Sequence, residues 1–129
     1  MRYDAKFLIG YGQLLSQDPA QLATAILLLE QSRKYFLSYG SILSTARAYR
    51  DCASYASAIR NYRFLTNYIP SRFLPKYELM RLYLKIRQIG QARRMAGEIT
   101  AMPVKIPSPE IEFMRREALN YLKLPDTAF

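Results

Sequence analysis

The sequence predicts an all-α protein in which about seven helices form stacked antiparallel pairs. Apolar residues recur at helical spacing along the chain, whereas sustained alternation and Asn-Gly or Asp-Gly hairpin signals are absent. Short breakers such as Asp18-Pro19 and Tyr39-Gly40 separate the periodic segments, and such short links favour antiparallel neighbours. The expected helices are 3–16, 20–38, 41–51, 55–68, 74–87, 89–101 and 109–123.

Length and composition are sufficient for one helical domain over 1–129, because half of the 129 residues are hydrophobic and can form a real core. Ser108 followed by Pro109 predicts the N-cap and first residue of the last helix. Cys52 is the one cysteine, and with no histidine to activate it we expect it to be a small buried side chain.

An offset of 34 residues aligns the middle of the chain with itself. Identical residues then coincide in these pairs: Arg47 and Arg81, Tyr49 and Tyr83, Ala58 and Ala92, Arg60 and Arg94. A small residue at such a position is expected where two helices of a pair cross closely, so Ala58 and Ala92 are predicted to be buried. The chain therefore contains an internal repeat of two helices.

The period is that of the tetratricopeptide (TPR) repeat, and the first repeat resembles this family in its aromatic, small, aromatic, apolar and closing proline positions. These positions hold Tyr49, Ala58, Tyr62, Leu65 and Pro70. The second repeat departs from the pattern, with Ala96 in place of Tyr62 and Val104 in place of Pro70. The resemblance implies a right-handed superhelix of helix pairs and a protein-interaction or scaffold role. Its expected parts are a degenerate leading pair at 1–38, repeats at 39–72 and 73–106, and a capping helix at 107–124.

A narrower resemblance rests on the order and spacing of four stretches, 35–43, 69–77, 82–83 and 104–108. Together they are similar to the soluble C-terminal TPR region of O-antigen ligase or polymerase-like membrane proteins of Bacteroides-type bacteria. This likeness implies a soluble domain of a membrane-associated cell-envelope protein, on either side of the membrane. It also implies that any glycan-transfer chemistry belongs to the membrane part of such a parent protein.

Positive charge is concentrated in the middle of the chain. The net charge is +9, and residues 47–94 hold eleven Arg or Lys against Asp51 and Glu78. In stacked repeats the first helix of each pair lines the concave face, which predicts a basic groove there. The candidate groove residues are Arg47, Arg50, Tyr77, Arg81 and Lys85. Arginine at such positions offers forked donors to carboxylate or phosphate, although a solvated basic face is the plainer alternative.

The expected partner of this groove is an acidic protein or peptide. The carboxylate clamp of chaperone-binding TPR domains is not reproduced, because the comparable faces show Leu43 and Arg47, then Leu74 and Glu78. Binding of nucleic acid or of anionic lipid by the same basic block remains the alternative, and docking as a structural subunit is a third. Phosphate binding should weaken steeply with salt, whereas apolar helix docking should not.

Catalysis, cofactors and metals are not expected in this chain. It has no histidine, which is the commonest general base and metal ligand, and one cysteine cannot form a thiolate cluster. Gly10-Tyr11-Gly12 lacks the third glycine and the lysine of a nucleotide loop, so we interpret these glycines as helix-packing residues.

Overall fold

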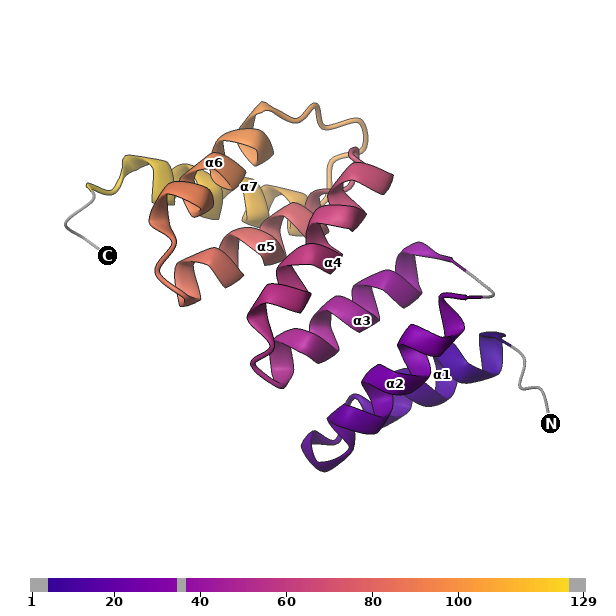
Figure 1. The fold of residues 1–129 in the computed structure, drawn as a ribbon. Coiled ribbons are helices and arrows are strands. Elements are labelled where there is room, and N and C mark those ends of the chain that lie inside the picture. Colours follow the sequence, from indigo (N-terminus) through magenta and orange to yellow (C-terminus); the bar gives the residue numbers. More distant parts are fainter. Residues whose placement is uncertain (1–4, 35–36, 126–129) are drawn as a thin grey trace. The chain divides into compact units, whose positions relative to one another are not determined.

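The computed structural model of the protein describes residues 5–34 and 37–125, with side chains from Leu8 onward. Over these residues the chain is all-helical, with no strand, which confirms the predicted fold class (Figure 1). A short 3-10 helix, η1 (Pro19–Gln21), joins the first two α-helices. The α-helices are α1 (Ala5–Leu15), α2 (Leu22–Ser32), α3 (Tyr39–Asp51), α4 (Tyr55–Tyr68), α5 (Phe73–Lys85), α6 (Ile89–Ala101) and α7 (Pro109–Lys123).

The chain divides into two compact units, Met1–Leu65 and Thr66–Phe129, and the boundary falls within α4. In the first unit α2 packs against both α1 and α3. Ala25, Leu29 and Ile42 are fully buried there and form part of its core. Gly12 of α1 faces α2 so closely that a Cβ at this position would lie 2.9 Å from Leu29 Cγ. Gly12 is thus a helix-packing residue, as predicted, whereas a Cβ at Gly10 would meet nothing within 4 Å.

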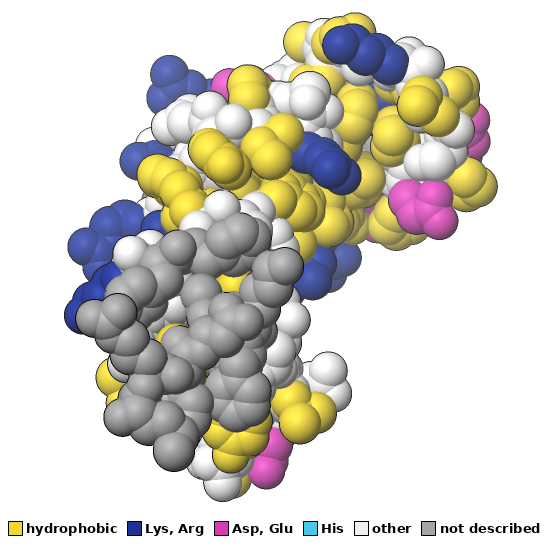
Figure 2. Space-filling model, turned by 90° about the vertical axis from the view of Figure 1, so that its right-hand side faces the viewer, with side chains coloured by type: hydrophobic (Ala, Val, Ile, Leu, Met, Phe, Trp, Pro, Cys, Tyr) yellow, Lys and Arg dark blue, Asp and Glu magenta, His cyan; other side chains and the backbone are white. Residues whose placement is uncertain are grey.

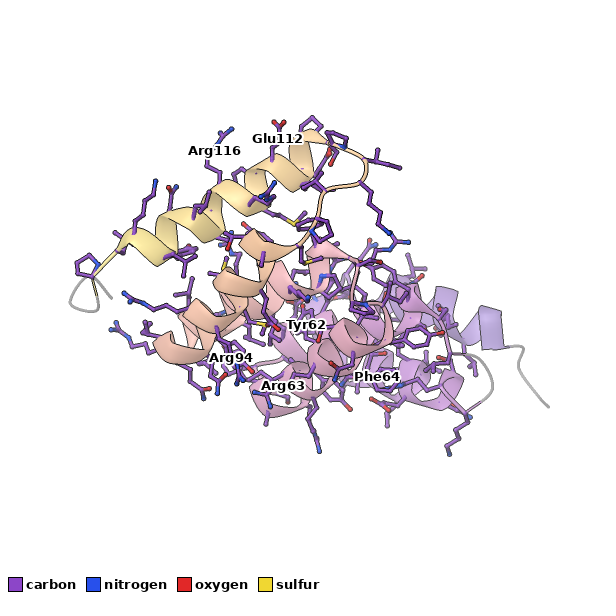
Figure 3. The ribbon with its side chains drawn as sticks, turned by 90° about the horizontal axis from the view of Figure 1, so that it is seen from above. Tyr62, Arg63, Phe64, Arg94, Glu112 and Arg116 are labelled. Carbon is purple, nitrogen blue, oxygen red and sulfur yellow. The ribbon has the colours of Figure 1, made fainter. Side chains whose placement is uncertain are left out.

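The second unit is a bundle of three helices in which α6 packs against both α5 and α7, and α5 also contacts α7. Each helix contributes one apolar side to the interior. Its most deeply buried side chains include Leu79, Met80, Tyr83, Ile99 and Ala118. On the opposite side of α7, Glu112 and Arg116 point away from α6 (Figure 3). The charged and apolar sides of this last helix therefore follow the amphipathic pattern of the sequence.

The 34-residue offset is visible in the helix boundaries, since α3 and α5 begin and end 34 residues apart and α4 and α6 also begin 34 apart. The turns agree as well, because Ala53 and Arg87 are the described non-glycine residues with positive φ, at 64° and 61°. Each turn closes with equivalent hydrogen bonds: Ser54 N donates to Tyr49 O and Gln88 N to Tyr83 O, both at 2.9 Å. This is the Schellman arrangement that ends many helices.

Several of the predicted helix boundaries were wrong. The helix expected at 74–87 ends at Lys85 with Ile86 as its C-cap. The larger error lies between the second and third helices. The second helix was expected to run to residue 38, but α2 ends at Ser32 with Arg33 as its C-cap. The next helix begins at Tyr39 rather than 41, because the Ser38 side chain accepts a hydrogen bond from Ser41 N and completes a capping box. Residues 35 and 36 lie outside the described part of the chain. At α7, Ser108 caps Ile111 N and Pro109 is the first residue, as predicted.

Burial confirms the predicted core positions and corrects one of them. Ala58 is 0% and Ala92 1% exposed, as expected for small residues inside a helix pair. Cys52 was expected to be buried, but it is exposed. It stands as the C-cap of α3, where Sγ donates to Tyr49 O at 3.3 Å, so the helix end holds it at the surface. Among the described helices, none combines the length and apolar character needed to cross a bilayer.

Candidate functional site

Arg47 and Arg50 lie one turn apart on α3 in the first unit, and both side chains are half-buried. Nε of Arg50 lies 3.1 Å from Asp51 Oδ1, and its Nη1 donates to the Tyr62 hydroxyl at 3.4 Å. Tyr62 is completely buried in α4. These contacts hold the Arg50 guanidinium between a carboxylate and the edge of the core, so its charge is partly compensated.

Tyr77, Arg81 and Lys85 follow one another at four-residue intervals along α5 in the second unit. Nη1 of Arg81 donates to the Tyr77 hydroxyl at 3.2 Å, and the guanidinium lies 5.9 Å from the centre of the Tyr77 ring. The hydrogen bond to Tyr77 is the main cause that raises the pKa of Arg81 above its ordinary value. Tyr77 is only 8% exposed, whereas Arg81 and Lys85 are exposed. Tyr77 is therefore largely buried and supports the exposed Arg81 side chain.

Helix α7 contributes to the surroundings of Arg81. The ring of Tyr77 meets Phe113 edge-on at 6.3 Å. Glu117 and Tyr121 of the same helix interact electrostatically with Arg81 and help to raise its pKa. Burial, followed by the Glu117 charge, raises the pKa of Tyr121. Arg81 thus keeps its positive charge at any physiological pH and has an acidic neighbour on α7.

The five predicted groove residues form two sets, Arg47 with Arg50 on α3 and Tyr77 with Arg81 and Lys85 on α5. The first set belongs to the first compact unit and the second set to the second. A groove that uses residues of both sets therefore remains a prediction. On the face drawn in Figure 2, dark blue Lys and Arg side chains occur at several places and magenta acidic ones are few. This agrees with the net charge of +9.

A polar pocket of about 360 Å³ lies within the first unit, and sequence reasoning missed it. It is lined by residues of α4, α3 and the C-terminal end of α2: Glu30, Arg33, Tyr49, Ser57, Arg60, Asn61 and Phe64. Its walls combine two guanidinium groups, one carboxylate, one amide, two hydroxyls and two aromatic rings. The sequence gives a partial signal at Arg60, which the repeat aligns with Arg94, whereas Arg33 falls inside the predicted helix 20–38.

Hydrogen bonds connect the walls of this pocket. Arg33 Nη1 donates to Asn61 Oδ1 at 2.5 Å and lies 3.5 Å from Glu30 Oε1. The guanidinium of Arg33 also lies 5.7 Å from the centre of the Phe64 ring. Arg60 Nη2 donates to Ser57 Oγ at 3.1 Å, so the acceptor of this hydrogen bond is a neutral hydroxyl. The pocket is therefore preorganised by contacts between three helices.

A second cavity, of about 410 Å³, opens in the second unit between α5 and α7. Its walls are almost entirely apolar and consist of Leu74, Tyr77, Pro109, Glu110, Phe113 and Met114. Phe113, which lines this cavity, is 50% exposed. The cavity offers apolar contact area next to Arg81, through the Tyr77 side chain that the two share.

The described residues contain no group of three His, Cys, Asp or Glu side chains placed to hold a metal ion. Their carboxylates serve visible structural roles: Asp51 pairs with Arg50, while Glu110 and Glu112 lie in the first turn of α7. Comparison with models of known protein families finds no match. Comparison with curated proteins also finds no significant match.

Proposed function

We propose that this chain is a non-catalytic, TPR-type interaction domain that binds an acidic protein segment through basic side chains of α3 and α5. Following the resemblance of its sequence, the domain would be the extramembrane part of an O-antigen ligase or polymerase-like cell-envelope protein. The proposal concerns binding, because the chain has no histidine, which is the commonest general base.

The observation that carries the proposal is the equivalence of Arg47 and Arg81. They stand 34 residues apart on α3 and α5, two helices whose boundaries repeat with the same offset. Each is followed within one turn by a second basic residue, Arg50 on α3 and Lys85 on α5. Each unit therefore carries the same charge at the same position of a repeated helix, which suits each of these helices to bind an acidic residue.

The chemistry of the two helices favours carboxylate ligands over a simple solvated surface. Arg50 and Arg81 are each fixed by a tyrosine hydroxyl, at 3.4 and 3.2 Å respectively. A guanidinium that is already oriented loses less side-chain entropy when it binds an anion. The apolar cavity beside Tyr77 could then take an apolar side chain of the same partner segment.

Binding of nucleic acid or anionic lipid is the second candidate, and the concentration of positive charge at residues 47–94 favours it. Such binding depends on the number of phosphates neutralised and so falls steeply with salt concentration. It would also depend less on which arginines are removed. These two properties separate it from recognition of an acidic segment.

The test compares the wild-type chain with the double variant Arg47→Glu, Arg81→Glu. The matched control is Arg94→Glu, Arg116→Glu, which makes the same charge change on α6 and α7 (Figure 3). Fluorescence anisotropy measures binding of a short Glu-rich peptide containing leucines, of duplex DNA and of phosphatidylserine vesicles, at low and moderate salt. Thermal unfolding by circular dichroism establishes that both variants fold.

We expect the α3/α5 variant to bind the peptide about tenfold or more weakly, while the control retains most of its affinity. Equal losses in the two variants would show that net charge alone is responsible. Tighter binding of DNA or vesicles than of peptide, with a steep salt dependence, would favour the second candidate. The resemblance to a membrane-protein tail is tested by the genomic reading frame upstream of Met1, where hydrophobic spans in frame would support it.

A further inference from the structure

The polar pocket between α2, α3 and α4, named here the Arg33/Arg60 pocket, contains more positive than negative charge. Its charged walls are Arg33, Arg60 and Glu30. Glu30 lies 3.5 Å from Arg33, whereas Arg60 donates its hydrogen bond to the neutral Ser57 hydroxyl. One guanidinium charge in the pocket is therefore left without a carboxylate in the wall. A concave site lined by an uncompensated charge concentrates ions of the opposite sign.

We propose that the Arg33/Arg60 pocket binds a phosphate monoester, with the two guanidiniums on the phosphate and the Phe64 ring against the organic group that it carries. This site is separate from the α3 and α5 side chains of the proposed function. Its volume of about 360 Å³ is within the range of small-ligand pockets and has room for a phosphate with an attached ring or short side chain.

A phosphate fits the donors of this pocket better than a carboxylate does. Two guanidiniums and the Ser57 hydroxyl can supply donors to the three terminal oxygens of a monoester, whereas a carboxylate has two oxygens. At neutral pH a phosphate monoester carries nearly two negative charges, so it gains more from the pair of guanidiniums. Arginine forks match phosphate geometry in particular.

The apolar part of the ligand is recognised by Phe64, which is 40% exposed although it belongs to the pocket wall. Arg33 lies over this ring at 5.7 Å and is held by Asn61 and Glu30, so ring and guanidinium form one continuous surface. An aromatic or aliphatic group attached to the phosphate can pack on the exposed part of the ring. Inorganic phosphate should therefore bind more weakly than an aryl phosphate.

Glu30 is the group that opposes a phosphate in this pocket. Its side chain is 39% exposed, so it can turn toward solvent when a dianion takes its place beside Arg33. Glu30→Gln removes this charge and keeps a side chain of the same size, so the variant should bind the phosphate more tightly. A simple attraction of anions to a basic surface would not predict an effect of this one carboxylate beyond its unit of net charge.

The experiment titrates the full chain with phenyl phosphate, inorganic phosphate, benzoate and a short phosphoserine peptide, followed by isothermal calorimetry and amide chemical shifts. Arg60→Gln should weaken phenyl phosphate binding about ten- to a hundredfold. Arg63→Gln is the matched control, because Arg63 lies on the same helix but does not line the pocket. Glu30→Gln should tighten binding about fivefold. The peptide and phenyl phosphate arms distinguish a phosphorylated protein from a small phosphate ester as the source.

Strong shifts at Ser57, Asn61 and Phe64 with phenyl phosphate, lost in Arg60→Gln and kept in Arg63→Gln, would support the site. Equal binding by the Arg60→Gln variant and the wild type would overturn it. So would an equal loss in both arginine variants, or a wild-type chain that binds benzoate as well as phenyl phosphate. These outcomes are independent of Arg47 and Arg81, so the two proposals can fail separately.

Discussion

The hydroxyl of Tyr49 on α3 donates a hydrogen bond of 3.2 Å to Oε1 of Glu30 on α2. The two residues are 19 positions apart, and the bond joins neighbouring helices at the edge of the Arg33/Arg60 pocket. Burial, and after it the charge and hydrogen bond of Glu30, raise the pKa of the Tyr49 phenol above its ordinary value. Tyr49 therefore stays protonated and keeps its donor at neutral pH.

The Glu30→Gln variant should lower the pKa of Tyr49 toward the ordinary value, because it removes the negative charge of Glu30, while burial still raises the pKa. Tyrosine Cζ chemical shifts followed by NMR across alkaline pH measure this directly, with Tyr49→Phe assigning the signal. The folded phenol holds its proton more tightly than the unfolded one. Its contribution to stability is thus complete below pH 10.0, the ordinary pKa of a tyrosine, and is lost as the pH rises through the higher pKa of the folded state. An unchanged Tyr49 titration in Glu30→Gln would contradict the close approach of the Glu30 carboxylate to the Tyr49 hydroxyl.

The two glycines of α1 should respond in opposite directions to alanine. At Gly12 the new Cβ would lie 2.9 Å from Leu29 Cγ and 3.3 Å from the Ala25 carbonyl oxygen, so Gly12→Ala should destabilise the protein by about 1–2 kcal/mol. Gly10→Ala meets nothing within 4 Å and should stabilise it by about 0.5–1 kcal/mol. Urea unfolding followed by circular dichroism measures both. Similar effects of the two changes would show that α1 does not pack closely on α2 at Gly12.

Enlarging the repeated alanines should disturb the core of each helix pair. Ala58 is 0% and Ala92 1% exposed, and leucine at either position adds volume where none is available. Ala58→Leu and Ala92→Leu should each lower the free energy of unfolding by roughly 1–3 kcal/mol. Ala56→Leu on exposed α4 surface is the control and should be nearly neutral. A melting temperature that does not change in Ala58→Leu would mean that this site is not packed.

The sequence correctly predicted those helix boundaries that depend on nearby residues. The Ser108-Pro109 cap and the start of α4 at Tyr55 follow from nearby residues and from the 34-residue offset, and the structure has both. The end of α2 was missed because 20–38 keeps its apolar character through Leu37, while a capping box at Ser38 determines where the next helix starts. Cys52 was misjudged from residue type, since its position as C-cap decides its exposure.

The Arg33/Arg60 pocket could not be read from the sequence because its contacts join distant residues. Arg33 and Asn61, which are hydrogen-bonded, are 28 positions apart, and neither belongs to a motif. A pairing of this kind depends on how α2 and α4 pack, and periodicity predicts only which face of each helix is buried. By contrast, spacing in the sequence predicts which residues share one helix face. Arg47 and Arg50 are three residues apart, and Tyr77, Arg81 and Lys85 follow one another at steps of four.

The two helix-ending turns should be stabilised by glycine. Ala53 and Arg87 have φ of 64° and 61°, a left-handed conformation in which a Cβ crowds the backbone. Glycine has no Cβ and is the usual residue at this position of a Schellman turn. Ala53→Gly and Arg87→Gly should therefore each raise the free energy of unfolding by up to about 1 kcal/mol. Chemical denaturation of the single and double variants measures the gain.

The control for this prediction is Ala53→Val, since a β-branched side chain tolerates positive φ even less than alanine does. Valine at this position should be destabilising, and its effect should be opposite in sign to that of glycine. The turn hydrogen bonds, Ser54 N to Tyr49 O and Gln88 N to Tyr83 O, need no side chain at the substituted positions, so both glycine variants should retain them. Exchange of the Ser54 and Gln88 amide protons that is no faster than in the wild type would report this. If Ala53→Gly destabilised the protein as much as Ala53→Val, the left-handed conformation of the turn would be refuted.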